Sequence, residues 1–88
     1  MSRRTSGRAA HTLRDSYRTA ARANNWQLCK EIAEQMRGLD GDGAEIQYAL
    51  AYALERLGRV DEARKAYGVV LLIDRRHEKA RARLRALA

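Results

Sequence analysis

The sequence has no proline and no phenylalanine, and it has one cysteine among its 88 residues. The single Cys29 cannot form an internal disulfide, and the chain has no C-x-x-C motif or Cys/His cluster that would hold zinc. Its longest aliphatic run, Val69 to Ile73, has five residues, whereas a membrane-spanning helix needs roughly 20. The first ten residues lack the apolar stretch of a secretory signal. We therefore expect a soluble, cytoplasmic protein in a reducing compartment.

The residues that are present favour helices and one small domain. Apolar residues make up 45% of the chain and charged residues 33%, so there are enough apolar side chains to form a core. Alanine and arginine dominate, and both are among the best helix formers. A chain of this length has room for one domain, which buries roughly 60% of the surface that the unfolded chain exposes.

Charge is distributed unevenly along the chain, whose net charge is +7. Residues 1–23 carry six arginines and one aspartate, and residues 75–88 carry six basic side chains and one glutamate. The middle section, residues 24–74, carries six basic and nine acidic side chains. The protein is therefore basic at both ends, which favours acidic partners.

Apolar residues recur at helical spacing in five segments, and residues that end or cap helices separate them. The pair Asn24–Asn25 can close the first helix and cap the second, while Gly38 and Gly58 are expected to end the second and third. Asp61 is expected to cap the fourth helix. The predicted helices cover about 9–25, 26–38, 44–57, 61–73 and 76–88.

The chain resembles itself at a displacement of 34 residues, where a turn meets a turn and apolar or small residues meet their like. The matched pairs include Asn24 with Gly58, Trp26 with Val60, Cys29 with Ala63, Met36 with Val70 and Leu39 with Ile73. A period of 34 residues built as helix, turn and helix is typical of the tetratricopeptide repeat. The sequence resembles this family, most clearly in its second copy.

Most positions that define the family are matched by similar residues in the second copy. The Leu-Gly pair, the first aromatic, the turn, the small residue and the second aromatic correspond to Leu50–Ala51, Leu54, Gly58, Ala63 and Tyr67. Gln47 replaces the usual tryptophan and Arg75 the helix-ending proline. In the first copy, Tyr17 stands where a small residue is expected and Ala33 where an aromatic is expected.

The resemblance implies an all-α fold of antiparallel helix pairs, stacked as a short tetratricopeptide-like solenoid of about five helices. We expect a basic mobile arm over residues 1–8 and a single domain over 9–88. Within it, repeat 1 covers about 10–43, repeat 2 about 44–75, and a capping helix about 76–88. Two repeats are fewer than the usual minimum of about three, so neighbouring copies could supply burial in a homo-oligomer.

In this family the first helices of the repeats line a concave groove, and the resemblance places the candidate binding residues there. The peptide-binding residues that we predict are Arg14, Arg18, Arg22, Tyr48, Tyr52, Glu55, Lys79 and Arg83. Some family members hold a partner's carboxylate terminus with a clamp of basic residues and asparagines. Arg14, Lys79 and Arg83 fall on the basic positions, but Arg18 and Ala49 replace the asparagines. The alternative readings are partial burial for the two tyrosines and plain solvation for the arginines.

Other kinds of site are expected to be absent. Cys29 and His11 could suggest a nucleophile and its base, but Cys29 occupies a small-residue position on an inward-packing helix. We expect no enzyme activity, no cofactor and no metal. The stretch Asp40–Gly43 resembles the start of a calcium loop but lacks its later oxygen ligands, so we predict a turn. Trp26 and Tyr67 are expected to be core aromatics by their helical phase.

The leading hypothesis is a protein–protein interaction module that binds an acidic or amphipathic segment of another protein in its groove. One alternative is nonspecific nucleic-acid binding through the basic ends, which contain Arg3, Arg4, Arg8, Arg81, Arg83 and Arg85. Another is a scaffold that self-assembles through the ends of the solenoid. A membrane partner is not expected from the sequence.

Overall fold

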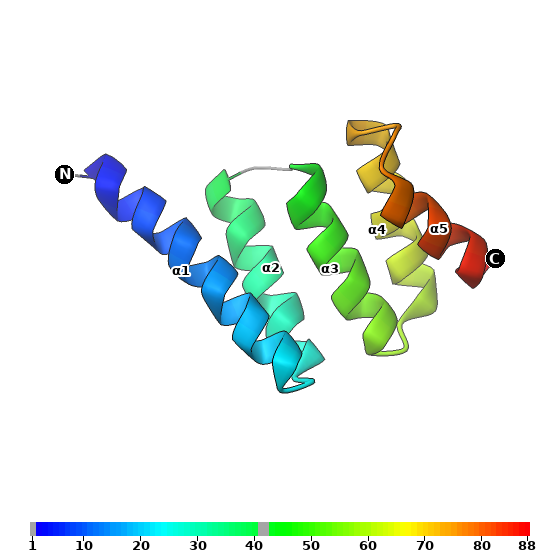
Figure 1. Ribbon diagram of the computed structural model, residues 1–88, viewed down its shortest axis with the longest axis horizontal. Helices are drawn as coiled ribbons and strands as arrows, with labels where there is room; N and C mark the ends of the chain where they lie inside the picture. Colours follow the sequence, from blue (N-terminus) through cyan, green and yellow to red (C-terminus); the bar gives the residue numbers. More distant parts are fainter. Residues whose placement is uncertain (1, 41–42) are drawn as a thin grey trace.

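The protein is all-α in the part that the structure describes. The computed structural model describes the backbone of residues 2–40 and 43–88 and the side chains of residues 12–39 and 43–88. Within these ranges there is no strand, and the helices are α1 (Ser2–Arg22), α2 (Trp26–Asp40), α3 (Ala44–Arg56), α4 (Val60–Ile73) and α5 (Glu78–Leu87) (Figure 1). The predicted all-α class and the predicted five helices are confirmed.

Consecutive helices run in opposite directions, and each packs against the next one along the chain (Figure 1). The molecule is elongated, with extents of 46 × 29 × 17 Å. Small side chains lie where the helices meet: Ala33, Ala51, Ala53 and Ala63 are fully buried, which allows close approach of the backbones. The larger buried side chains that fill the core are Ile32, Met36, Ile46, Leu50, Leu54, Tyr67 and Val70.

The turns after α1 and α3 have the same geometry, and they lie 34 residues apart. Asn24 (φ 58°) and Gly58 (φ 81°) both adopt the left-handed conformation. Their amides donate to carbonyls three residues earlier, at 3.0 and 2.9 Å, and the next amides donate five residues back, at 2.8 and 3.0 Å. These paired bonds form a Schellman motif, which satisfies the last carbonyls of each helix. The two helix–turn–helix units therefore share one kind of turn.

Alanine substitution at two glycines, Gly58 before α4 and Gly68 inside it, should change the stability of the fold in opposite directions. Gly58→Ala is expected to destabilise the fold by about 1 kcal/mol, because a Cβ is strained at positive φ. Gly68 lies inside α4, and its Cβ would meet nothing within 4 Å, so Gly68→Ala should stabilise by about 0.5–1 kcal/mol. Urea unfolding of both variants measures the difference. Equal effects of the two substitutions would contradict the assigned turn.

Several predicted helix ends need correction. Gly38 does not end α2, which continues to Asp40. Asp61 is not the N-cap of α4 but lies in its first turn, where its charge still favours the helix dipole; the N-cap is Arg59. Helix α5 begins at Glu78, two residues later than predicted. The predicted cap at the start of α2 is confirmed, since Asn25 Oδ1 accepts a hydrogen bond from the Leu28 amide at 3.2 Å.

Helix α1 includes residues 2–8, the segment for which the sequence predicts a mobile arm. The side chains of residues 1–11, including His11, and the residues Gly41 and Asp42 of the predicted turn lie outside the described residues. The mobility of the arm stays a prediction.

Candidate functional site

The structure contains a hollow where α1, α3 and the end of α2 meet. It has a volume of about 360 Å³, near the lower end of the range of about 300–1,000 Å³ found for ligand pockets. The Tyr17 hydroxyl of α1 donates a hydrogen bond of 2.7 Å to the Ala49 carbonyl of α3 and so ties the two walls together. The residues that line the hollow are Arg14, Tyr17, Arg18, Met36, Glu45, Ile46 and Ala49.

Two of the three predicted arginines of α1 line this hollow, and the third does not. Arg14 and Arg18 are exposed, one helical turn apart, at the rim. Arg18 lies 4.0 Å from Asp15, but both side chains are mostly exposed, so the pair contributes little stability. Arg22 is exposed in the last turn of α1 and does not line the hollow. Arg14 and Arg18 can therefore present positive charge beside an apolar wall.

The predicted Tyr48 and Tyr52 belong to a chain of aromatic rings along α3. Their rings stack with centroids 6.2 Å apart. Tyr52 meets the edge of Trp26 at 5.5 Å, and Tyr48 lies 5.6 Å from the fully buried Tyr67. Both tyrosines are half-buried, so the alternative of partial burial applies to them, and burial raises the pKa of Tyr48. Arg56 lies above the Trp26 ring at 5.4 Å, a cation–π contact.

Trp26 and Tyr67 have different environments, although the sequence predicts both as core aromatics. Tyr67 is fully buried, and the prediction is confirmed for it. Trp26 is half-buried and packs at the edge of the core, beneath Arg56.

The predicted Glu55 and Arg83 bind each other across α3 and α5. Arg83 Nε donates to Glu55 Oε1 at 2.9 Å, and a second bond from Arg83 to the other carboxylate oxygen makes the contact bidentate. The Tyr67 hydroxyl also donates to Glu55, at 2.8 Å. The Arg83 hydrogen bond holds the pKa of Glu55 below its usual value, and the same bond raises the pKa of Arg83. A peptide carboxylate would have to compete with Glu55 for this arginine.

This network should make the fold sensitive to acid. The folded-state pKa of Glu55 is lower than the unfolded value of about 4.5, so its stabilising effect is present above that pH and is lost as the pH falls through the folded pKa. Thermal unfolding should show a Tm difference between the protein and Glu55→Gln that shrinks as the pH falls below about 4.5. A difference independent of pH would contradict the assigned charge on Glu55.

His77 is a residue that the sequence analysis did not identify. It is buried and precedes α5, where its Nδ1 accepts a hydrogen bond from the Ala80 amide at 3.1 Å and so caps the helix. Its Nε2 lies 3.1 Å from Glu45 Oε1, and its ring stacks on Tyr48 with centroids 5.0 Å apart. Histidine is not among the usual N-cap residues, so the amino-acid sequence gives no clear sign that His77 caps α5. His77 fastens the start of α5 to α3.

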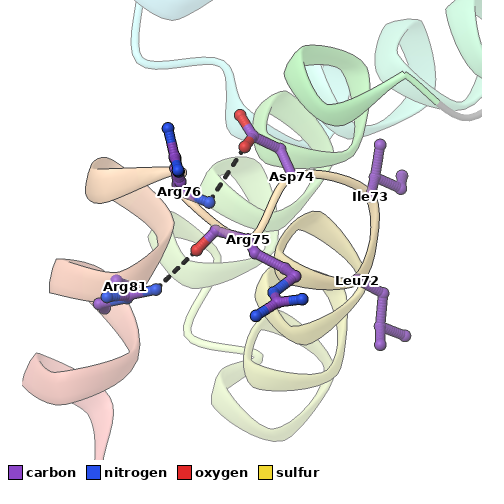
Figure 2. Close-up of a pocket in the computed structure, with 6 residues that line it drawn as sticks. All are labelled: Leu72, Ile73, Asp74, Arg75, Arg76 and Arg81. Carbon is purple, nitrogen blue, oxygen red and sulfur yellow. Dashed lines mark hydrogen bonds between the residues drawn. The ribbon is translucent and has the colours of Figure 1, made fainter.

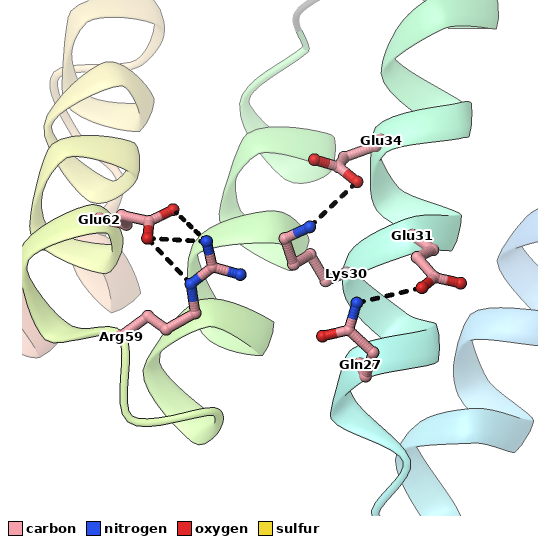
Figure 3. Close-up of polar contacts among 6 residues, drawn as sticks. All are labelled: Gln27, Lys30, Glu31, Glu34, Arg59 and Glu62. Carbon is pink, nitrogen blue, oxygen red and sulfur yellow. Dashed lines mark hydrogen bonds and ion pairs between the residues drawn. The ribbon is translucent and has the colours of Figure 1, made fainter.

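Many polar and charged side chains elsewhere on the surface contact neighbours on their own helix. On α2, Gln27 contacts Glu31 at 3.0 Å and Lys30 contacts Glu34 at 3.4 Å (Figure 3). At the start of α4, Arg59 makes a bidentate contact with Glu62 (Figure 3). Such exposed pairs each stabilise a helix by only a few tenths of a kcal/mol, about 0.2–0.5. Several acidic residues of the middle section, residues 24–74, therefore serve to stabilise the helix surface.

The remaining titratable groups offer little chemistry in the described part of the chain. Cys29 is buried, and burial raises the pKa of its thiol, which disfavours the reactive thiolate. Among the described residues no group of three His, Cys, Asp or Glu side chains could hold a metal ion. None of the described helices is both long enough and apolar enough to cross a membrane. The predicted Lys79 is exposed on α5.

Comparisons of the chain with protein-family models, with curated proteins and with solved structures found no match.

Proposed function

We propose that this protein is a tetratricopeptide-like interaction module that binds an acidic, amphipathic segment of another protein in the hollow between α1 and α3. In this reading, α1 with α2 and α3 with α4 are two repeats, and α5 is the capping helix. The residues of the hollow carry the proposal: apolar walls from Tyr17, Met36 and Ala49 lie beside the exposed charges of Arg14 and Arg18. No enzymatic step is part of this proposal.

Positions 34 residues apart support the repeat reading. Asn24 and Gly58 occupy the same place in the two Schellman turns. Burial also agrees, because Cys29 and Ala63 are both fully buried, as are Ala33 and Tyr67. Ala33 and Tyr67 occupy equivalent positions, but one side chain is small and the other is large. In this proposal the two units therefore have similar backbones and differently packed cores.

The chemistry of the hollow selects the kind of peptide. A leucine or a similar side chain can bury apolar surface against Tyr17, Met36 and Ile46. Carboxylates beside it can accept hydrogen bonds from the guanidinium groups of Arg14 and Arg18, which bind carboxylates in bidentate geometry. Carboxylates thus give specificity, and apolar burial adds affinity.

The predicted site residues have different roles in this proposal. Arg83 and Glu55 already form a bidentate pair, so in this proposal they shape the end of the groove and do not bind the peptide directly. Tyr48 and Tyr52 have half-buried rings that stack on each other, and in this proposal they extend the apolar surface for the peptide. Arg14 and Arg18 provide the main ionic contacts.

Fluorescence anisotropy with a labelled peptide of alternating leucine and glutamate tests the proposal. We expect saturable binding that weakens as salt rises, because the arginine contacts are exposed and screened. The matched control is the same peptide with glutamine in place of glutamate, which should bind much more weakly. Equal binding of both peptides at every salt concentration would contradict an acidic ligand.

A further inference from the structure

The corner where α4 meets α5 exposes an unusual set of apolar side chains. Leu72 is 83% exposed, the highest value among the large apolar residues that the structure describes as exposed, and Ile73 is 45% exposed. Val69, one turn earlier on α4, is 36% exposed. Figure 2 shows Leu72 and Ile73 pointing away from the ribbon at the end of α4. Single exposed leucines are common, but three neighbouring apolar side chains at one helix end indicate a contact surface.

Positive charge lies beside the apolar tip that Leu72 and Ile73 form. A hollow of about 570 Å³ beside it is lined by Leu72, Ile73, Asp74, Arg75, Arg76 and Arg81, so three guanidinium groups oppose one carboxylate. That carboxylate is already engaged, because Asp74 Oδ1 accepts a hydrogen bond from the Arg76 amide at 3.0 Å (Figure 2). The hollow is therefore suited to an anionic group.

The backbone of the corner is held in place by its own arginine. The Arg81 guanidinium of α5 donates a 2.6 Å hydrogen bond to the Arg75 carbonyl and so crosses from α5 to the linker (Figure 2). This linker comprises residues 74–77, and the Asp74 side chain also binds it, through the Arg76 amide. Within the described part of the chain the Arg75 side chain makes no hydrogen bond or ion pair, and its guanidinium is exposed beside Leu72 (Figure 2). The apolar tip and the basic hollow are thus fixed relative to each other.

We propose that this corner docks on the surface of anionic phospholipid membranes. Leu72 and Ile73 would enter the boundary between headgroups and acyl chains, while Arg75, Arg76 and Arg81 contact lipid phosphates. Charge complementarity and shape favour this occupant: the apolar side chains project outward and the arginines lie beside them, in the order in which a phospholipid presents acyl chain and phosphate. Apolar insertion and electrostatic attraction reinforce each other in such peripheral binding.

Vesicle cosedimentation of the full chain tests the proposal, with vesicles that contain phosphatidylserine and vesicles of phosphatidylcholine alone. We expect binding to the anionic vesicles only. Leu72→Ser should weaken binding about tenfold, since the leucine side chain that enters the membrane is lost. Arg75→Gln should weaken binding about fivefold, since one contact to a lipid phosphate is lost. The matched controls, Leu39→Ser and Arg37→Gln on α2, change exposed residues outside the corner and should alter binding less than about twofold.

Each other result would overturn the proposal. If Leu72→Ser binds as well as the unchanged protein, the corner does not insert, and the basic ends alone hold the vesicle. If inorganic phosphate displaces the protein at constant ionic strength, the hollow binds free phosphate instead of a membrane headgroup. If sedimentation shows a dimer that Leu72→Ser removes while vesicle binding is absent, the apolar tip belongs to a contact between copies. Circular dichroism confirms that each variant stays folded.

Discussion

Replacing Tyr67 by alanine is expected to destabilise the fold by about 3–5 kcal/mol, the cost typical of deleting a buried aromatic ring. Tyr67 is fully buried on α4 and packs against Tyr48 of α3, and its hydroxyl binds Glu55. The variant would lose this packing and leave a cavity between the two helices. For a domain of this size, whose total stability is about 5–10 kcal/mol, the change removes a large fraction of the folding free energy.

Thermal unfolding followed by circular dichroism measures this effect. Tm should fall by about 12–40 °C, since each kcal/mol shifts the Tm of a small domain by about 4–8 °C. Tyr67→Phe is the matched control: it keeps the ring and loses only the hydroxyl bond to Glu55, so it should cost about 1–2 kcal/mol. A Tyr67→Ala protein as stable as Tyr67→Phe would mean that the ring does not fill the core.

Reversing the charges of Arg14 and Arg18 should abolish the proposed peptide binding. Arg14→Glu with Arg18→Glu replaces two attractive contacts by two repulsive ones, and each lost charged hydrogen bond contributes about 1.5 kcal/mol or more. Affinity for the leucine–glutamate peptide should therefore fall about 100-fold or more. Both side chains are exposed, so the fold should tolerate the change, and the unfolding transition should stay in place.

The control for this variant changes the same number of charges at the other basic surface. Arg75→Glu with Arg76→Glu lowers the net charge equally but lies at the α4–α5 corner, outside the hollow. It should leave peptide affinity within about threefold while it abolishes vesicle binding. Equal loss of peptide binding in both double variants would attribute the binding to net charge alone and contradict a defined site.

Local signals in the sequence predicted the helices and their turns well. Asn24 and Gly58 tolerate positive φ, and Asn25 can cap the following helix, so these features follow from short stretches of chain. The burial of Tyr67 follows from its phase on α4. Gly38 shows the limit of such signals, because it lies within α2; a glycine permits a stop but does not require one.

The sequence could not predict the contacts that join distant helices. Glu55 and Arg83 lie 28 residues apart, and their pairing depends on where α5 lies against α3. His77 meets Glu45 across 32 residues, and the Tyr17 hydroxyl meets Ala49 across the same separation. For these reasons the sequence could predict Glu55 and Arg83 as candidate site residues but could not show that they bind each other.

The exposure of Leu72 was also hidden in the sequence. Leu72 belongs to the longest aliphatic run of the chain, which suggests a buried segment. In the structure Val70 of the same run is fully buried, whereas Leu72 and Ile73 lie at the end of α4, beyond its packed face. An apolar run alone does not show which of its side chains meets a neighbouring helix.

The most direct test of the proposed function is NMR of the ¹⁵N-labelled protein titrated with the leucine–glutamate peptide. We expect the backbone amide signals of Arg14, Arg18 and Ala49 to shift together as the peptide concentration rises, because these residues line one hollow. The amides of Leu72–Arg76 at the α4–α5 corner should not change. Unchanged amide signals around the hollow at saturating peptide, or shifts confined to the α4–α5 corner, would rule out the proposed peptide site.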